Sequence, residues 1–149
     1  MKSLFTTEAH KEILNRIDQL DEQKPAQWGT MNVSQMLSHC NFPLQVALQD
    51  LTLKKPNVFM RLLFSMFKSS LYNDKSWKQG MPTAKEFIVN NDKDFNTEKS
   101  KLVEKINQFH AEKSKTEWPP HPMFGNFTSE QWGKMQYKHL DHHLKQFGV

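Results

Sequence analysis

The sequence predicts an all-α protein, and three observations support this prediction. Apolar residues recur at intervals of three and four wherever a pattern is visible, which is the spacing that gives a helix one apolar face. Strong strand signals, such as a sustained alternation of apolar and polar residues, are absent. Two segments, beginning at Asn32 and Thr128, carry the residue pairing that closes the first turn of a helix.

Length and composition predict a single domain over residues 1–149. A chain of 149 residues is long enough to bury a core of its own. Hydrophobic residues make up only 37%, but eleven Phe, eight Met and four Trp supply the large side chains that a core needs. The chain has no Gly/Ser-rich linker and no repeat at a fixed period, so nothing marks a domain boundary.

The N-terminal segment predicts a cytoplasmic protein. Charged residues interrupt its apolar residues every three or four positions, as in neither a signal peptide nor a membrane span. The single Cys40 agrees, because one cysteine cannot form an internal disulfide framework. The net charge of +4 is smaller than the charge that nucleic-acid binders usually concentrate on one face. We therefore expect neither a nucleic acid nor a membrane as partner.

The first predicted helix covers about residues 7–20, where the apolar residues form one stripe between charged residues. The next helix begins after Asn32, with Gln35 three residues later in a variant of the capping box. Pro43 lies inside this second helix and has no N–H to donate to the carbonyl of His39. The sequence therefore predicts a local kink beside His39.

The region 52–95 carries the weakest pattern. Residues 58–72 suggest a short helix that is apolar on most of its circumference, and turn-forming residues after it predict irregular structure. A further helix is expected over about residues 97–112. The stretch TEWPPHPMFGN then has three prolines in four positions, which predicts an extended and stiff connection.

The last predicted helix, about residues 128–147, has the clearest start. Thr128 and Gln131 satisfy the capping-box pattern, while Phe127 and Trp132 are placed as a hydrophobic staple across the cap. At about 100° per residue, His139 and His143 fall at the centre of the face that must be buried, and His142 at its rim. The same face carries Trp132, Gln136 and Phe147, flanked by Met135 and Leu140, whereas Lys134, Lys138, Asp141 and Lys145 occupy the opposite side.

Two imidazoles one turn apart on a buried face need partners for four ring nitrogens. A divalent metal meets this need, because side chains at i and i+4 can share one ion. The alternatives are that core carbonyls satisfy both rings, or that the face is more hydrated. A metal also needs a third ligand, for which the candidates are His10, His39, His110 and His121.

Two longer stretches resemble a known family. They are WGTMNVSQMLSHCNFPLQVAL, residues 28–48, and HPMFGNFTSEQWGKMQYKHLDHHLKQFG, residues 121–148. Together they resemble the DinB-like superfamily, in particular a bacterial branch carried as a domain of unknown function, and the resemblance spans nearly the whole chain. It implies a four-helix bundle with a long crossover and an extra short helix in the 52–95 insertion. It also implies that His39, His139 and His143 hold a divalent metal.

The resemblance further implies a function, because characterised members of the superfamily include thiol-dependent transferases and isomerases. We therefore expect an enzyme that carries out thiol transfer or metal-assisted hydrolysis on a small-molecule substrate, such as a low-molecular-weight thiol. The expected metal is zinc or nickel, with iron and manganese as alternatives, since all-imidazole sites discriminate poorly. Gln136 is a candidate to orient a ligand or a bound water. The candidate catalytic residues are His121, His142 and Glu130.

The alternative is a non-catalytic module that binds a small ligand or a partner on the same scaffold. The stretch Val58–Tyr72 favours it, because this stretch has more apolar residues than one stripe of a bundle needs. It is a candidate interface for a homodimer.

Overall fold

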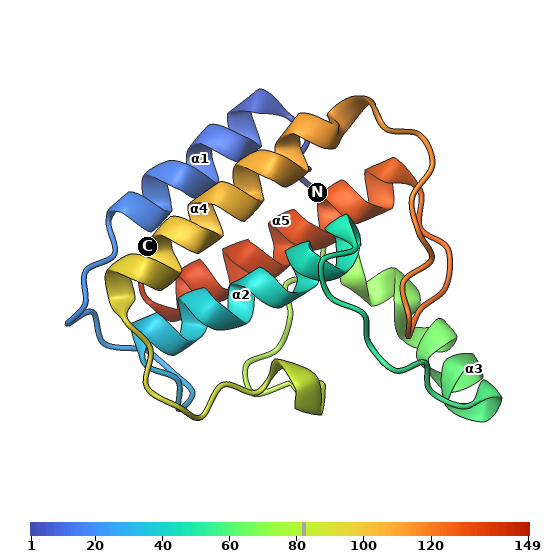
Figure 1. Cartoon of the computed structure of the whole chain (residues 1–149), viewed down its shortest axis with the longest axis horizontal. Coiled ribbons are helices and arrows are strands. Elements are labelled where there is room, and N and C mark those ends of the chain that lie inside the picture. The colour runs from blue at the N-terminus through green and yellow to red at the C-terminus, as the bar shows by residue number, and fades with distance from the viewer. Residues whose placement is uncertain (82) are drawn as a thin grey trace.

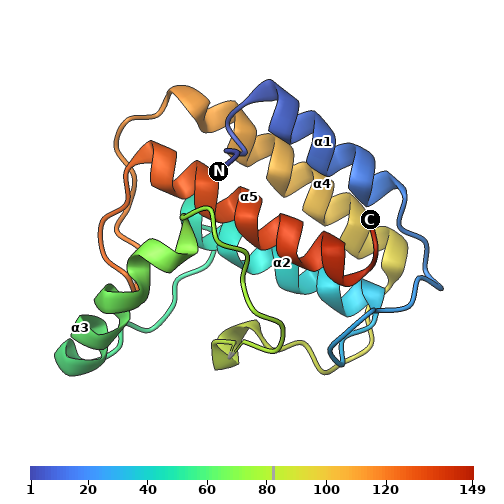
Figure 2. The same cartoon turned by 180° about the vertical axis from the view of Figure 1, so that it is seen from behind.

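Four helices lie side by side and form the body of the molecule (Figures 1 and 2). The computed structural model describes residues 1–81 and 83–149. Within these residues the chain forms five α-helices and no strand, which confirms the all-α prediction. The helical body consists of α1 (Thr7–Asp18), α2 (Val33–Leu48), α4 (Phe95–Ala111) and α5 (Ser129–Gln146), and the fifth helix, α3 (Val58–Phe67), projects from it.

The two predicted capping boxes are present. At the start of α2, the Gln35 amide N–H donates to Asn32 Oδ1 at 2.8 Å, and the Asn32 amide N–H donates to Gln35 Oε1 at 3.0 Å. At the start of α5, Thr128 and Gln131 exchange the same two hydrogen bonds. Each box satisfies two N–H groups that the first turn would otherwise leave unpaired. Both helices therefore begin where the sequence predicts.

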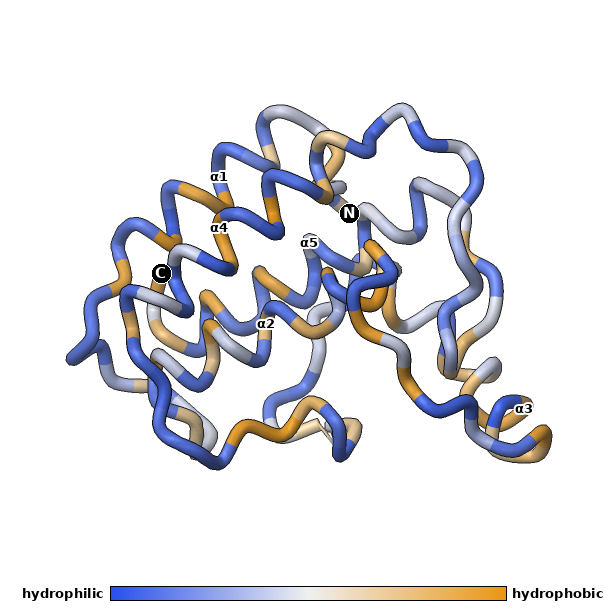
Figure 3. Tube along the Cα trace, viewed as in Figure 1, coloured by the Kyte–Doolittle hydropathy of each residue, from blue (hydrophilic) through white to orange (hydrophobic). Residues whose placement is uncertain are grey.

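The core fills the space between the four helices of the body. Each contributes an apolar stripe, which Figure 3 shows as orange positions recurring along helices that are otherwise blue. The largest fully buried side chain is Trp132, and the ring centroid of Phe127 lies 5.2 Å from that of Trp132, as the predicted staple requires. Other fully buried residues include Ile13, Ile17, Met36, Leu37, Leu44, Leu102, Ile106, Phe109, Leu140 and Phe147.

A long crossover joins α2 to α4. The chain runs from left to right along both helices in Figure 1, so residues 49–94 must return across the body between them. This crossover carries α3 and two 3-10 turns, η1 (Lys68–Leu71) and η2 (Lys85–Phe87). The extra short helix expected in the 52–95 region is thus α3, although it ends at Phe67.

Lys138 is a correction to the predicted orientation of α5. The helical pattern places it on the solvent side, but it is buried. Its Nζ donates to the Ser70 carbonyl at 2.7 Å, and to the carbonyl and Oδ1 of Asn73 at 3.0 and 2.8 Å. The crossover covers this side of α5 and supplies three acceptors for the ammonium group, which helical periodicity cannot anticipate.

α2 continues through Pro43 to Leu48, and the local kink expected beside His39 stays a prediction. One connection differs from expectation. The proline-rich stretch before α5 is not simply extended, because His121 and Gly125 form an isolated antiparallel bridge with two backbone hydrogen bonds of 2.9 Å. Gly125 has a φ of +74°, which a residue without Cβ adopts most easily, so the chain can turn there. A third 3-10 turn, η3 (Glu112–Ser114), follows α4.

None of the helices in the described part of the chain has both the length and the apolar composition that crossing a membrane requires.

Candidate metal centre

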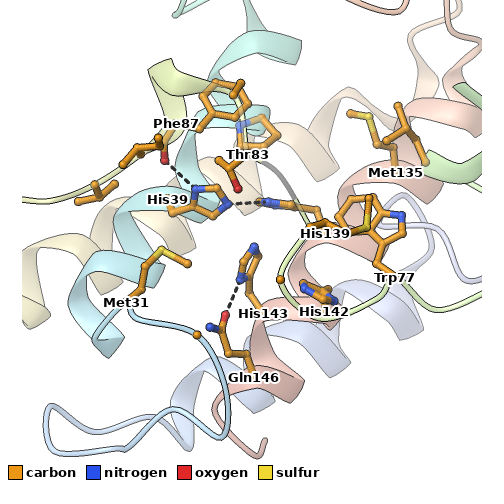
Figure 4. A pocket seen from close by; sticks show the side chains of 18 of the residues that line it. Met31, His39, Trp77, Thr83, Phe87, Met135, His139, His142, His143 and Gln146 are labelled. Carbon is orange, nitrogen blue, oxygen red and sulfur yellow. Dashed lines mark hydrogen bonds between the residues drawn. The ribbon is translucent and has the colours of Figure 1, made fainter. Parts of the chain in front are cut away.

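Three histidines from two helices converge in the interior. His39 projects from α2 and His139 and His143 from α5, and Figure 4 shows the three rings pointing toward one another. Each side chain is buried, and one ring nitrogen of each lies within 4.8 Å of the others. Because α2 packs against α5, residues a hundred positions apart come together. The three residues that the resemblance implied as ligands therefore form one cluster.

A backbone carbonyl of the crossover orients His39. The Nδ1 atom of His39 lies 2.9 Å from the carbonyl oxygen of Phe87, which can only accept a hydrogen bond. Nδ1 therefore carries the hydrogen, and Nε2 keeps its lone pair. This nitrogen points toward His139 and His143 (Figure 4). Such an arrangement, with one ring nitrogen bonded to a carbonyl and the other free, is typical of histidine ligands.

A side-chain amide orients His143 in the same way. The Nδ1 atom of His143 lies 2.8 Å from Gln146 Oε1, and Gln146 Nε2 donates to the Trp28 carbonyl at 2.7 Å. The second bond fixes which end of the amide is the donor, so Oε1 must accept from His143 Nδ1. His143 Nε2 is then also left with a lone pair. Two of the three rings thus have a defined tautomer that suits metal ligation.

His139 completes the cluster with a close contact. Its Nε2 atom lies 3.1 Å from Nε2 of His39, which carries a lone pair. Either a hydrogen on His139 Nε2 or a shared cation must lie between these two nitrogens, since two lone pairs repel each other. His139 Nδ1 is also buried and has no hydrogen-bond partner among the described residues. The short distance between these two nitrogens and the presence of three imidazole ligands fit a cation held by the three rings.

Burial keeps the three rings neutral at pH 7. It lowers the pKa of His39, lowers that of His139 well below its ordinary value, and lowers that of His143 to about 3. The positive charges that neighbouring histidines would carry add to the effect at His139 and His143. Neutral imidazole is the form that binds metal ions, so no proton must be displaced from a charged ring at neutral pH.

A cavity of about 990 Å³ adjoins the cluster. The crossover forms much of its wall, and α2 and α5 form its floor with His39, His139 and His143. The indole ring of Trp77 stands beside the cluster, with its centroid 5.9 Å from that of His139. Three imidazoles leave a four-coordinate metal one open position, the pattern of catalytic rather than structural zinc sites. If the three rings held such an ion, a small molecule in the cavity would have access to that position.

The structure separates the three candidate catalytic residues. His142 is half-buried and lines the cavity, with its ring centroid 5.1 Å from that of His143. His121 also lines the cavity and is buried among aromatic rings. Glu130 does not line it, because its largely exposed side chain pairs with Lys134 at 2.6 Å. Two of the three candidates are therefore placed to meet a bound molecule.

Gln136, His10 and His110 have their partners outside the three-ring cluster. Gln136 Nε2 donates to the Pro43 carbonyl at 2.8 Å, which ties α5 to α2. His10 and His110, considered as third ligands, instead stack on each other between α1 and α4 with centroids 4.1 Å apart. His39 is thus the candidate that the fold brings to His139 and His143.

Sequence reasoning missed three partners of the cluster. Gln146 lies three residues after His143 on the same helix, a spacing that places two side chains side by side and was therefore detectable. The Phe87 carbonyl and the Trp77 ring were not detectable, because both belong to the crossover, whose path the pattern does not define. Cys40 is buried and its Sγ lies 3.6 Å from Met36 Sδ, so it packs in the core.

Comparison with known proteins identifies the family of the chain but no individual relative. Residues 2–148 match the sequence model of a family described as "Protein of unknown function (DUF1569)". Neither the curated proteins nor the solved structures contain a match to the chain. Since the match spans nearly all of the sequence, the chain belongs to the DUF1569 family.

Proposed function

We propose that the protein is a metal-dependent enzyme of the DinB-like type, with a divalent metal bound by His39, His139 and His143. The observation that carries the proposal is the cluster of three buried, neutral imidazoles at the floor of a large cavity. The side-by-side arrangement of α1, α2, α4 and α5 and the long crossover are compatible with a DinB-like four-helix bundle.

The proposed metal is zinc or nickel, with iron or manganese as alternatives. Each of these ions accepts imidazole ligands, and a site made only of imidazoles discriminates poorly among them. The hydrogen bonds of His39 and His143 to oxygen acceptors support ligation, because they hold the rings in place before an ion arrives.

The proposed reaction is thiol transfer or metal-assisted hydrolysis. A divalent ion at such a site would lower the pKa of a bound water or thiol. Burial lowers the pKa of His142, so its imidazole is neutral at pH 7 and able to accept a proton. His142 also lies against the rings of Trp28 and Trp77, which place it at the cavity wall. It is our candidate general base.

Elemental analysis of the purified, chelator-free protein tests the metal site. We expect about one metal ion per chain, and its loss in the His139→Ala, His143→Ala double variant, because one imidazole cannot hold the ion alone. His142→Ala is the matched control, since it removes a neighbouring imidazole of α5 that is not in the cluster. A protein that neither contains metal nor takes up added zinc or nickel would contradict the proposal.

The second candidate function is a non-catalytic small-ligand-binding module. The observation that favours it is that none of the described residues lining the cavity is Asp or Glu. A general base of the carboxylate type is therefore missing there, and only His121 and His142 remain beside the three cluster residues. Metal binding without turnover of any thiol or ester substrate would favour this candidate.

A further inference from the structure

The described residues that line the cavity carry no formal charge. Charged residues make up 24% of the chain, yet none of the described residues that line the cavity is Lys, Arg, Asp or Glu. The polar lining consists of histidines and of uncharged side chains such as Thr30, Gln35 and Asn90. Away from the histidine cluster, an ionised group of a ligand would lose hydration without gaining a charged partner from these residues, which is unfavourable.

Lys138 illustrates how the fold keeps charge out of this wall. Its Nζ atom lies 5.6 Å from the centroid of the Trp77 ring, which lines the cavity. All three of its hydrogens go to acceptors of Ser70 and Asn73. The ammonium group is thus occupied and is not offered to a ligand.

Aromatic rings line the cavity in two places. Trp77 stands over the histidine cluster, with its ring 5.9 Å from His139 and 5.7 Å from His142. Phe64 of α3 also lines the cavity and packs against Phe124, with ring centroids 5.8 Å apart. Such walls bind flat, apolar bodies by contact with their faces and edges.

We infer that the cavity binds an uncharged small molecule with an aromatic or other apolar body and one donor group, a thiol or a hydroxyl, that reaches the histidine cluster. This inference rests on the proposed function and narrows its substrate class. It disfavours thiols that carry a carboxylate or an ammonium group on the body, because the lining residues against which the body lies offer no counter-charge, and the charge of the proposed ion is met by the donor group. The body lies against Trp77 and Phe64, and the donor group lies at the rings of His39, His139 and His143.

A matched pair of thiols tests the inference on cobalt-loaded protein. The neutral probe is (4-methylphenyl)methanethiol, and the charged probe is 4-(mercaptomethyl)benzoate, which differs only by a carboxylate in place of the methyl group. Binding is followed by the cobalt absorption spectrum and by tryptophan fluorescence, since Trp28 and Trp77 line the cavity. We expect the neutral thiol to bind at least tenfold more tightly, and we expect a new thiolate-to-cobalt band when it binds.

A pair of lysine variants on α3 serves as the structural control. Phe64→Lys places a cation in the cavity wall, whereas Met66→Lys places one on the exposed side of the same helix, where Met66 is 73% exposed. No residue of α3 is buried, so neither variant disrupts the core. We expect Phe64→Lys to reduce the preference for the neutral thiol at least tenfold, and Met66→Lys to leave it unchanged.

The outcomes separate the two proposals. Equal or tighter binding of the carboxylate to cobalt-loaded wild-type protein would overturn the inference while leaving the metal site intact. If protein incubated with cobalt showed no absorption bands of bound cobalt, the proposed function would be overturned, and with it the placement of the donor group at the cluster. A neutral preference that Met66→Lys abolishes as fully as Phe64→Lys would show that the cavity wall is not its source, and would also overturn the inference.

Discussion

Gln146 fixes the ring of His143 and is therefore expected to control metal affinity. Its amide links His143 Nδ1 to the Trp28 carbonyl through two hydrogen bonds. We predict that Gln146→Leu lowers metal affinity about 10–100-fold, the usual effect of removing a partner that orients a histidine ligand. Competition with a chromogenic chelator measures this affinity. Lys145→Leu is the control, because Lys145 is the preceding residue and is largely exposed. Equal affinities in the two variants would contradict the prediction.

His121 is expected to make stability depend on pH. Burial lowers its pKa from 6.5 to about 4. The unfolded chain therefore binds a proton below about pH 6.5 that the folded protein takes up only near pH 4, so stability falls as the pH drops through this window. For His121 alone, the free energy of unfolding falls by about 3 kcal/mol across this window.

Urea titrations of metal-free protein between pH 8 and pH 4 test this dependence. His121→Gln keeps an acceptor for the Met123 amide N–H, which His121 Nδ1 accepts at 3.2 Å, but it removes the titration. We expect the free energy of unfolding of this variant to fall less between pH 7 and pH 4 than that of wild type. Between pH 7 and pH 8 the two curves should run parallel, because His121 is then neutral in both states. Identical slopes below pH 6.5 would refute the assignment.

At the residue scale, the sequence predicts the histidines of the cluster better than their partners. The i, i+4 spacing of His139 and His143 follows from helix geometry alone. The choice of His39 over His10 and His110 does not, because it depends on which face of α2 meets α5. The carbonyl of Phe87 could not be predicted by any side-chain pattern, since every residue carries one.

Among the elements, the start of a helix is predictable where residues close in the sequence form its N-terminal cap. The boxes at Asn32 and Thr128 depend on residues three positions apart, so no tertiary contact is needed to form them. The crossover is different, because its short elements are held by contacts with α5 and α2 that lie far away in the sequence. The burial of Lys138 was mispredicted for the same reason.

Lys138 is expected to fasten the crossover to α5. Its three hydrogen bonds reach residues on either side of the end of η1. We predict that Lys138→Met lowers the free energy of unfolding by about 1–3 kcal/mol, because the carbonyls of Ser70 and Asn73 lose a charged donor. Amide hydrogen exchange of residues 58–77 should speed up by more than exchange of the core helices. Lys145→Met, on the exposed side of α5, is the control. Uniform exchange changes across the molecule would argue against a local fastening role.

At the scale of the molecule, the all-α class follows from periodicity, but the path of the crossover does not. Periodicity identifies which helices have an apolar stripe, and four of the five described helices bury theirs in the body. α3 buries none, because one side of it faces the cavity and the other faces solvent. Its apolar circumference therefore reflects two separate surfaces rather than one core-facing stripe.

The solvent side of α3 is our candidate interface for a homodimer. Val58, Phe59 and Met66 are 82%, 75% and 73% exposed, and Leu62 lies between them on the helix. Single exposed apolar residues are common, but a contiguous set on a projecting helix is a typical docking surface. A second copy offers the same surface, and two-fold pairing of identical patches is the commonest form of oligomer. We predict a dimer in light scattering, and conversion to a monomer by Phe59→Glu.

The choice of position decides what the dimer experiment reports. A charge at Phe64 would act on the cavity, because Phe64 lines it and packs on Phe124. Phe59 is instead among the most exposed residues of α3, so Phe59→Glu acts on the outer surface alone. Ser65→Glu is the control, since it adds the same charge to α3 without removing apolar area. Wild-type protein that stays monomeric at high concentration would remove the homodimer, whereas dissociation by Ser65→Glu as well would assign the effect to charge rather than to apolar contact.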